Sequence, residues 1–174
     1  MKMINATDVD PVLAIALGRF TQASAQLERS IQSAIIRLLP LSDDMGLTLL
    51  CENSIRTNLD ILSRVIELPS VPIPEDWKKR LQERIPKVKR SSEDRNRLVH
   101  NVIMEAEQGY IAAVEKKGTR VALPIDAATI AGWADEANEH SCWFMTVPHG
   151  VYDFSQWENR WPEYEVKNWP ARPA

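Results

Sequence analysis

Apolar residues recur at spacings of three and four in four stretches of the chain, a period typical of helices that bury one face. The predicted helices span residues 10–39, 42–68, 75–103 and 126–145. Ser42 is a favourable N-cap for the second helix. Pro86 should kink or split the third, because proline removes a backbone donor. The four stretches predict a mainly α fold, an antiparallel helical bundle of four to five helices.

Two short, partly β-branched segments separate the third and fourth helices. They cover residues 110–115 and 119–123, and the polar turn between them predicts a small β-hairpin insertion. The last segment, residues 151–174, has no helical period and interleaves tryptophans with prolines. We therefore divide the chain into a helical bundle at residues 1–150 and an irregular Trp/Pro-rich C-terminal tail. The tail is expected to pack back on the bundle, and capture of a partner is the alternative.

Length and composition favour one domain with an ordinary core. The chain has 174 residues, and 44% of them are hydrophobic. It has no apolar run long enough for a transmembrane helix and no apolar stretch at its start typical of a signal peptide, so we expect a cytoplasmic protein without membrane contact. Two cysteines, Cys51 and Cys142, make neither a disulfide framework nor a zinc cluster. No metal and no cofactor are therefore expected.

The net charge of −3 argues against broad binding to nucleic acid, which requires a positive surface. The distribution of charge along the chain is uneven, however. Residues 78–97 contain nine basic and three acidic side chains, whereas residues 1–77 contain six and ten. This basic segment is compatible with a grip on a short stretch of nucleic acid at one site, and a solvated helix face is the alternative.

The basic segment leads into residues 91–102, which read SSEDRNRLVHNV. With residues advancing about 100° each on a helix, Leu98, Val99 and Val102 all lie within about 60° of Arg95. Arg95 is therefore centred on the apolar stripe of its own helix. A buried arginine is costly unless an anion meets it.

Two interpretations of Arg95 stay open on geometry alone. In the first, it forms a core salt bridge with Asp44, Glu52 or Asp60 of the second helix, and His100 is a satisfied border residue. In the second, it forms an anion site, because its planar guanidinium suits phosphate and His100 titrates near neutral pH.

The string Arg95-Asn96-Arg97-Leu98-Val99-His100 resembles the R-N-x-x-x-H form of the motif of HEPN domains (higher eukaryotes and prokaryotes nucleotide-binding). The resemblance covers about residues 10–145. It implies a small helical bundle, commonly a homodimer through the motif-bearing helix, and a metal-independent endoribonuclease activity typical of toxins and defence effectors. It also implies RNA as substrate, with an antitoxin or other protein as a further partner.

The same resemblance implies catalytic roles for three residues. Arg95 would hold the scissile phosphate, His100 would act as general base or acid for attack by the RNA 2′-hydroxyl, and Asn96 would orient either group. Val102 stands where some toxin members have a tyrosine that an antitoxin modifies, which puts that subtype in doubt. Since some members of the family only bind, a non-catalytic module for RNA, nucleotide or protein is the alternative function.

Further residues are assigned from their positions. The expected substrate-binding residues are Arg97, Lys89, Arg90, Ser54 and Asn58, with Ser54 and Asn58 either lining a polar floor opposite Arg95 or simply tolerated in their helix. His140 and His149 are expected at the surface. Cys51 lies on an apolar stripe and is expected in the core.

Overall fold

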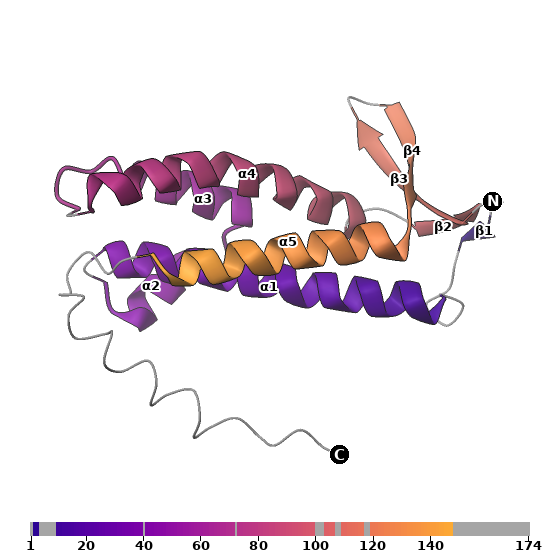
Figure 1. The fold of residues 1–174 in the computed structure, drawn as a ribbon, viewed down its shortest axis with the longest axis horizontal. Coiled ribbons are helices and arrows are strands. Elements are labelled where there is room, and N and C mark those ends of the chain that lie inside the picture. Colours follow the sequence, from indigo (N-terminus) through magenta and orange to yellow (C-terminus); the bar gives the residue numbers. More distant parts are fainter. Residues whose placement is uncertain are drawn as a thin grey trace, which may run out of the picture.

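The computed structural model describes residues 2–3, 10–39, 41–71, 73–99, 103–106, 109–116 and 119–147. Within them the chain forms five helices and one four-stranded antiparallel sheet (Figure 1). The helices are α1 (Pro11–Leu38), α2 (Asp43–Leu50), α3 (Ile55–Val65), α4 (Glu75–Val99) and α5 (Ala127–Met145). The strands are β1 (Lys2–Met3), β2 (Ile103–Ala106), β3 (Gly109–Lys116) and β4 (Thr119–Ile125). The predicted fold class is confirmed, and the tail with His149 lies outside the described residues.

Helix α1 is the centre of the bundle. Asp10 caps its start by accepting a hydrogen bond from the backbone N–H of Val12, and Pro11 occupies the first turn, where a missing donor costs nothing. The period of three and four places one stripe of α1 in the core, and it packs against all four other helices. That stripe includes Leu13, Phe20, Leu27, Ile31 and Ile35.

Helices α1 and α5 lie side by side and run in the same direction. The ring of Phe20 contacts that of Trp133 with centroids 6.0 Å apart, and further along both helices Arg37 donates to the backbone oxygen of Phe144. Helix α4 runs the opposite way to both, as Figure 1 shows. The three long helices therefore form the frame on which α2 and α3 pack.

The second predicted helix, residues 42–68, is two helices, so the prediction of one continuous helix was wrong. Ser42 caps α2 as expected, with the backbone N–H of Met45 donating to its hydroxyl at 3.3 Å. The chain then turns at residues 51–54, and Ser54 caps α3. Cys51 lies in this turn and is exposed, so its predicted place in the core was also wrong.

Helix α4 is continuous through Pro86, and the predicted split is absent from its described span. Pro86 and Gln82, whose carbonyl oxygen the proline cannot reach with an N–H, are both exposed, so solvent can satisfy that oxygen. The helix ends at Val99 rather than at residue 103, because β2 begins at Ile103.

The predicted hairpin is confirmed as β3 and β4, paired from Tyr110 with Ile125 to Lys116 with Thr119. Two further strands were not expected: β2 pairs with β3, and β1 pairs with β2. Buried Ala112 and Ile125 join the sheet to the core. The sheet connects the end of α4 to the start of α5 at one end of the bundle (Figure 1). Among the described residues, no helix combines the length and apolar character needed to cross a membrane.

Candidate active site

The motif segment lies at the end of α4. The backbone of Arg95, Asn96 and Arg97 is helical and belongs to this helix. Their side chains, and the whole of His100, lie outside the described residues. The described residues that lead up to the motif belong to α3, α4 and α5.

The buried face of α4 changes character just before the motif. It is apolar at Leu81, Ile85 and Val88, and then becomes polar at Ser91 and Ser92, which are 8% and 7% exposed. The hydroxyl of Ser92 donates to the backbone oxygen of Lys89 at 2.8 Å. Position 95 follows Ser91 and Ser92 by one helical turn. The stripe that was predicted from sequence thus continues toward the motif as a polar strip.

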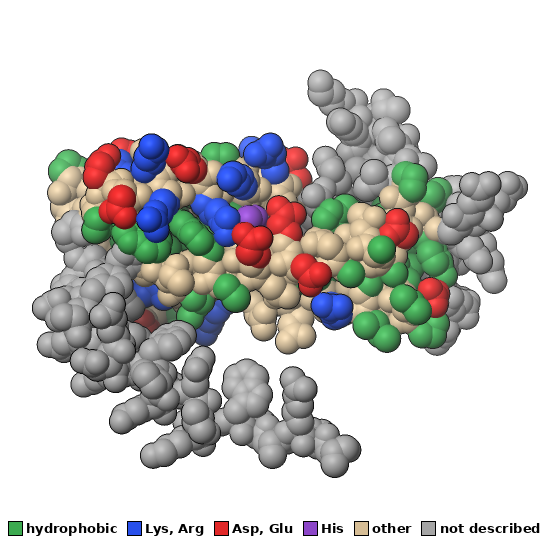
Figure 2. Space-filling model, in the orientation of Figure 1, with side chains coloured by type: hydrophobic (Ala, Val, Ile, Leu, Met, Phe, Trp, Pro, Cys, Tyr) green, Lys and Arg blue, Asp and Glu red, His purple; other side chains and the backbone are tan. Residues whose placement is uncertain are grey.

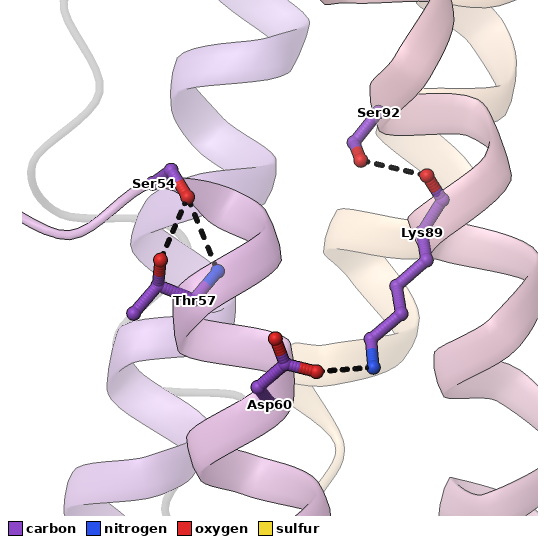
Figure 3. A network of polar contacts seen from close by, with 5 residues as sticks. All are labelled: Ser54, Thr57, Asp60, Lys89 and Ser92. Atoms are coloured by element: carbon purple, nitrogen blue, oxygen red, sulfur yellow. Dashed lines mark hydrogen bonds and ion pairs between the residues drawn. The ribbon is translucent and has the colours of Figure 1, made fainter.

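Helices α3 and α4 are held in one antiparallel register by charged pairs. The ammonium of Lys89 donates to Asp60 Oδ1 at 2.6 Å, as Figure 3 shows, and Lys78 reaches Glu67 Oε2 at 2.7 Å. These two pairs bring position 54, at the start of α3, level with positions 91 to 95 of α4. The N-terminus of α3 therefore faces the motif end of α4.

These pairs also shift the pKa values of Asp60, Glu67 and Lys78. The hydrogen bond from Lys89 lowers the pKa of the Asp60 carboxyl, and that from Lys78 lowers the pKa of Glu67. The hydrogen bond to Glu67 raises the pKa of Lys78. These shifts keep Asp60, Glu67 and Lys78 charged at neutral pH, so the contacts between α3 and α4 hold the register in place under ordinary conditions.

Ser54 and Asn58 have definite structural contacts. The hydroxyl of Ser54 accepts from the backbone N–H of Thr57 at 3.1 Å and bonds the Thr57 hydroxyl at 2.9 Å (Figure 3). Asn58 is fully buried, and its amide donates to the backbone oxygen of Leu50 at 3.4 Å, joining the end of α2 to α3. Ser54 is exposed at the level of the motif, whereas Asn58 lies one turn deeper.

Of the other predicted binding residues, Lys89 is in an ion pair and Arg90 is exposed. Lys89 is half-buried and engaged with Asp60, which removes Asp60 as a free partner for Arg95 in the salt-bridge interpretation. The two other carboxylates considered for that bridge, Asp44 and Glu52, are exposed, and Arg90 is exposed as well. The salt-bridge interpretation thus loses the candidate that α3 offered.

His140 was predicted at the surface, and this was wrong. It is 4% exposed on α5, three residues after buried Ala137 and four before buried Phe144. Its Nε2 lies 3.5 Å from Glu136 Oε1, and neither ring nitrogen makes a hydrogen bond to any residue that the structure describes. Burial, assisted by the charge of Arg84, lowers the pKa of the imidazole.

Sequence reasoning also missed two cation–aromatic contacts, one within α4 and one between α4 and α5. The guanidinium of Arg84 lies 5.2 Å from the ring centroid of Trp143, and that of Arg80 lies 5.4 Å from that of Trp77. The two tryptophan rings are themselves 5.8 Å apart. The signal in the sequence was the spacing of Trp77, Arg80 and Arg84, which places them on adjoining faces of one helix.

No family model, no curated protein and no solved structure matches this chain. Among the described residues, no three His, Cys, Asp or Glu side chains are grouped so that they could hold a metal ion.

Proposed function

We propose that the protein is a metal-independent endoribonuclease of the HEPN type that cleaves single-stranded RNA. The observation that carries the proposal is the register of α3 and α4, which brings the N-terminus of α3 level with residues 91–95, just where the motif begins. The first N–H groups of a helix have no partners within it, and they favour anions together with the helix dipole. A phosphate held by Arg95 would gain from that positive end.

The proposed reaction needs only groups of the chain and of RNA. Arg95 binds the scissile phosphate, and His100 takes the proton of the 2′-hydroxyl as that oxygen attacks phosphorus. The bond from phosphorus to the 5′-oxygen breaks, and this oxygen receives a proton, from the second copy of His100 in a composite site. The products are a 2′,3′-cyclic phosphate and a 5′-hydroxyl end. Asn96 orients the imidazole or the phosphate.

The proposal includes a homodimer through α4, with two copies of the motif facing each other across a two-fold axis. Ser54, Arg90 and Arg97 then supply further contacts to the RNA. An activity of this kind suits a cytoplasmic toxin or defence effector that a protein partner holds in check.

The test is cleavage of a single-stranded RNA by the purified protein in EDTA. We expect cleavage by the parent, with a 2′,3′-cyclic phosphate at the new end, and none by Arg95→Ala or His100→Ala. Arg29→Ala is the matched control, since Arg29 is an exposed arginine of α1 and should leave cleavage unchanged.

Circular dichroism and size-exclusion chromatography would check that each variant folds and assembles like the parent. Undiminished cleavage by folded Arg95→Ala and His100→Ala would refute the proposal. RNA binding that depends on Arg95 without any cleavage would support the non-catalytic module instead.

A further inference from the structure

A small pocket lies between α4 and α5, apart from the motif. Its volume is about 130 Å³, and its lining is mostly cationic and aromatic. The lining residues are Arg80, Glu83, Arg84, Lys87 and Trp143. In Figure 2 the blue Lys and Arg side chains gather over α4, whereas the α1 side of the same view shows few of them.

The arginine at the centre of this pocket is held in place. The Arg84 side chain is 19% exposed, donates to Glu139 Oε1 at 2.9 Å and lies against the ring of Trp143. Its Nε is buried without a hydrogen-bond partner among the described residues. A guanidinium fixed in this way loses little conformational entropy when it binds an anion.

The cations of the pocket are only partly neutralised. Arg84 has Glu139, and Arg80 has Asp76 at 4.0 Å on the exposed surface. Lys87 makes no ion pair with any residue that the structure describes. The lining also contains the carboxylate of Glu83, so Lys87 and the weakly paired Arg80 are the cations most open to an added anion.

The three cations form a row that points along α4 to the motif. At about 100° per residue, positions 80, 84, 87, 91 and 95 fall within about 80° of one another on the helix surface. The rise of about 1.5 Å per residue puts position 95 about 12 Å beyond Lys87. Buried Ser91 lies between them, at the edge of the polar strip described above.

We propose that Arg80, Arg84 and Lys87 form a phosphate-binding row that holds the backbone of single-stranded nucleic acid as it leads to the motif. This inference rests on the proposed function, because the row leads the strand to the proposed catalytic motif. It places the strand on the α5 side of α4. On the α3 side both Lys78 and Lys89 are in short ion pairs, at 2.7 Å and 2.6 Å, whereas on the α5 side the Arg80–Asp76 pair is 4.0 Å long and Lys87 makes no ion pair with a described residue.

The test measures binding of a fluorescein-labelled 2′-O-methyl oligoribonucleotide of about 12 nucleotides, a length within the range of known single-strand sites. The methyl group blocks the attacking hydroxyl, so binding is read without cleavage. The variant is Arg80→Gln/Lys87→Gln, which leaves the packed Arg84 intact. The control is Arg29→Gln/Arg64→Gln, which removes two exposed cations from α1 and α3.

Each phosphate contact contributes about 0.7 to the slope of log affinity against log salt for a single strand. Loss of two contacts should lower that slope by about 1.4. Between 50 mM and 200 mM salt, the parent should therefore lose about seven-fold more affinity than Arg80→Gln/Lys87→Gln. The control should keep the slope of the parent.

Equal slopes for the row variant and the control, or no binding by the parent, would overturn the row. Row-dependent binding without cleavage of unmodified RNA would keep the row and refute the nuclease. Cleavage that depends on Arg95, together with binding that Arg80→Gln/Lys87→Gln leaves unchanged, would support the nuclease and overturn the row.

Discussion

Replacement of the buried histidine of α5 by leucine should stabilise the protein and change how its stability depends on pH. In the folded chain His140 makes no hydrogen bond with the described residues, and the cationic Arg84 of α4 disfavours its protonation. Glu136 and Glu139 act in the opposite direction, but burial is the largest influence and lowers the pKa of His140. The folded protein therefore keeps this imidazole neutral at a pH where the unfolded chain protonates it.

The expected change in the free energy of unfolding has two parts. A buried polar group without a partner costs about 1–3 kcal/mol, and an apolar group of similar size removes that cost. We expect His140→Leu to raise the free energy of unfolding by about 1 kcal/mol near neutral pH, and the melting temperature by about 2–4 °C. The second part comes from protonation of His140 in the unfolded chain. It depends on pH and contributes below the usual histidine pKa of about 6.5.

The sign of the pH dependence follows from proton uptake. The unfolded parent binds one more proton than the folded parent between the lowered pKa of His140 and about 6.5. Its stability is therefore complete above that range and falls on acidification, by at most about 1.4 kcal/mol per pH unit. His140→Leu lacks this loss, so its advantage over the parent should grow as the pH decreases from about 7.5 to about 5.5.

Urea and thermal unfolding, followed by far-UV circular dichroism at several pH values, would measure both parts. His100 and His149 are present in both proteins, so their titration cancels in the difference. Glu136→Gln is a useful companion variant, because loss of the carboxylate should move the lower end of the pH window further down. Parallel loss of stability by the parent and His140→Leu on acidification would refute the reasoning.

Three further predictions follow from contacts of α2 and α3. Gly46→Ala should lower the free energy of unfolding by about 1–3 kcal/mol in a urea titration, because the added carbon would lie 2.3 Å from Ile36 Cγ1; unchanged stability would show that α2 shifts freely. Ser54→Ala should lower stability by about 1 kcal/mol through loss of the cap, and a matching loss of RNA affinity at constant fold would show that the hydroxyl also contacts RNA. A double-mutant cycle of Asp60→Asn and Lys89→Met should give a favourable coupling that weakens in high salt, and zero coupling at low salt would contradict the role of this pair in the α3–α4 register.

The long helices were predictable because their stripes are long and strictly periodic. Helices α1 and α5 have nearly the predicted bounds, each with an aspartate cap at its start. The break between α2 and α3 was missed, because the apolar positions on both sides keep one helical phase through it. Its signal was Ser54 followed by Thr57, a cap pattern inside the stretch.

The sheet could be predicted only in its local part. The hairpin of β3 and β4 has a short polar connection between two partly β-branched segments, so its sequence specifies it. Strand β1 is two residues long and pairs with β2, about a hundred residues further along the chain, and no local pattern encodes such a contact. Strand β2 was missed for the same reason: the predicted helix of residues 75–103 took in Ile103, and residues 104–106 were assigned to no element.

For the candidate site, the sequence identified the motif, but not the partners of the basic residues. Lys89 and Arg84 look alike in a composition count, yet one is engaged by Asp60 and the other lies on Trp143. The spacing of His140 from Ala137 and Phe144 indicated a place on the buried face of its helix. The prediction was wrong because a histidine was assumed to lie at the surface. Which carboxylate meets which cation depends on helix register, which pairs of distant residues determine.

The parallel contact of α1 and α5 has a consequence for how the chain folds. These two helices share a more extensive contact than any other pair of described elements, yet Arg19 and its partner Asp135 are 116 residues apart in sequence. The contact order is therefore high for a helical protein, and folding should be slower than in a bundle of sequential hairpins. The apolar face of α1 includes Leu13, Phe20 and Leu27. During synthesis, that face lacks its main packing partner until α5 emerges from the ribosome. This is the interval in which a chaperone, or a second nascent chain, would find the apolar face of α1 open.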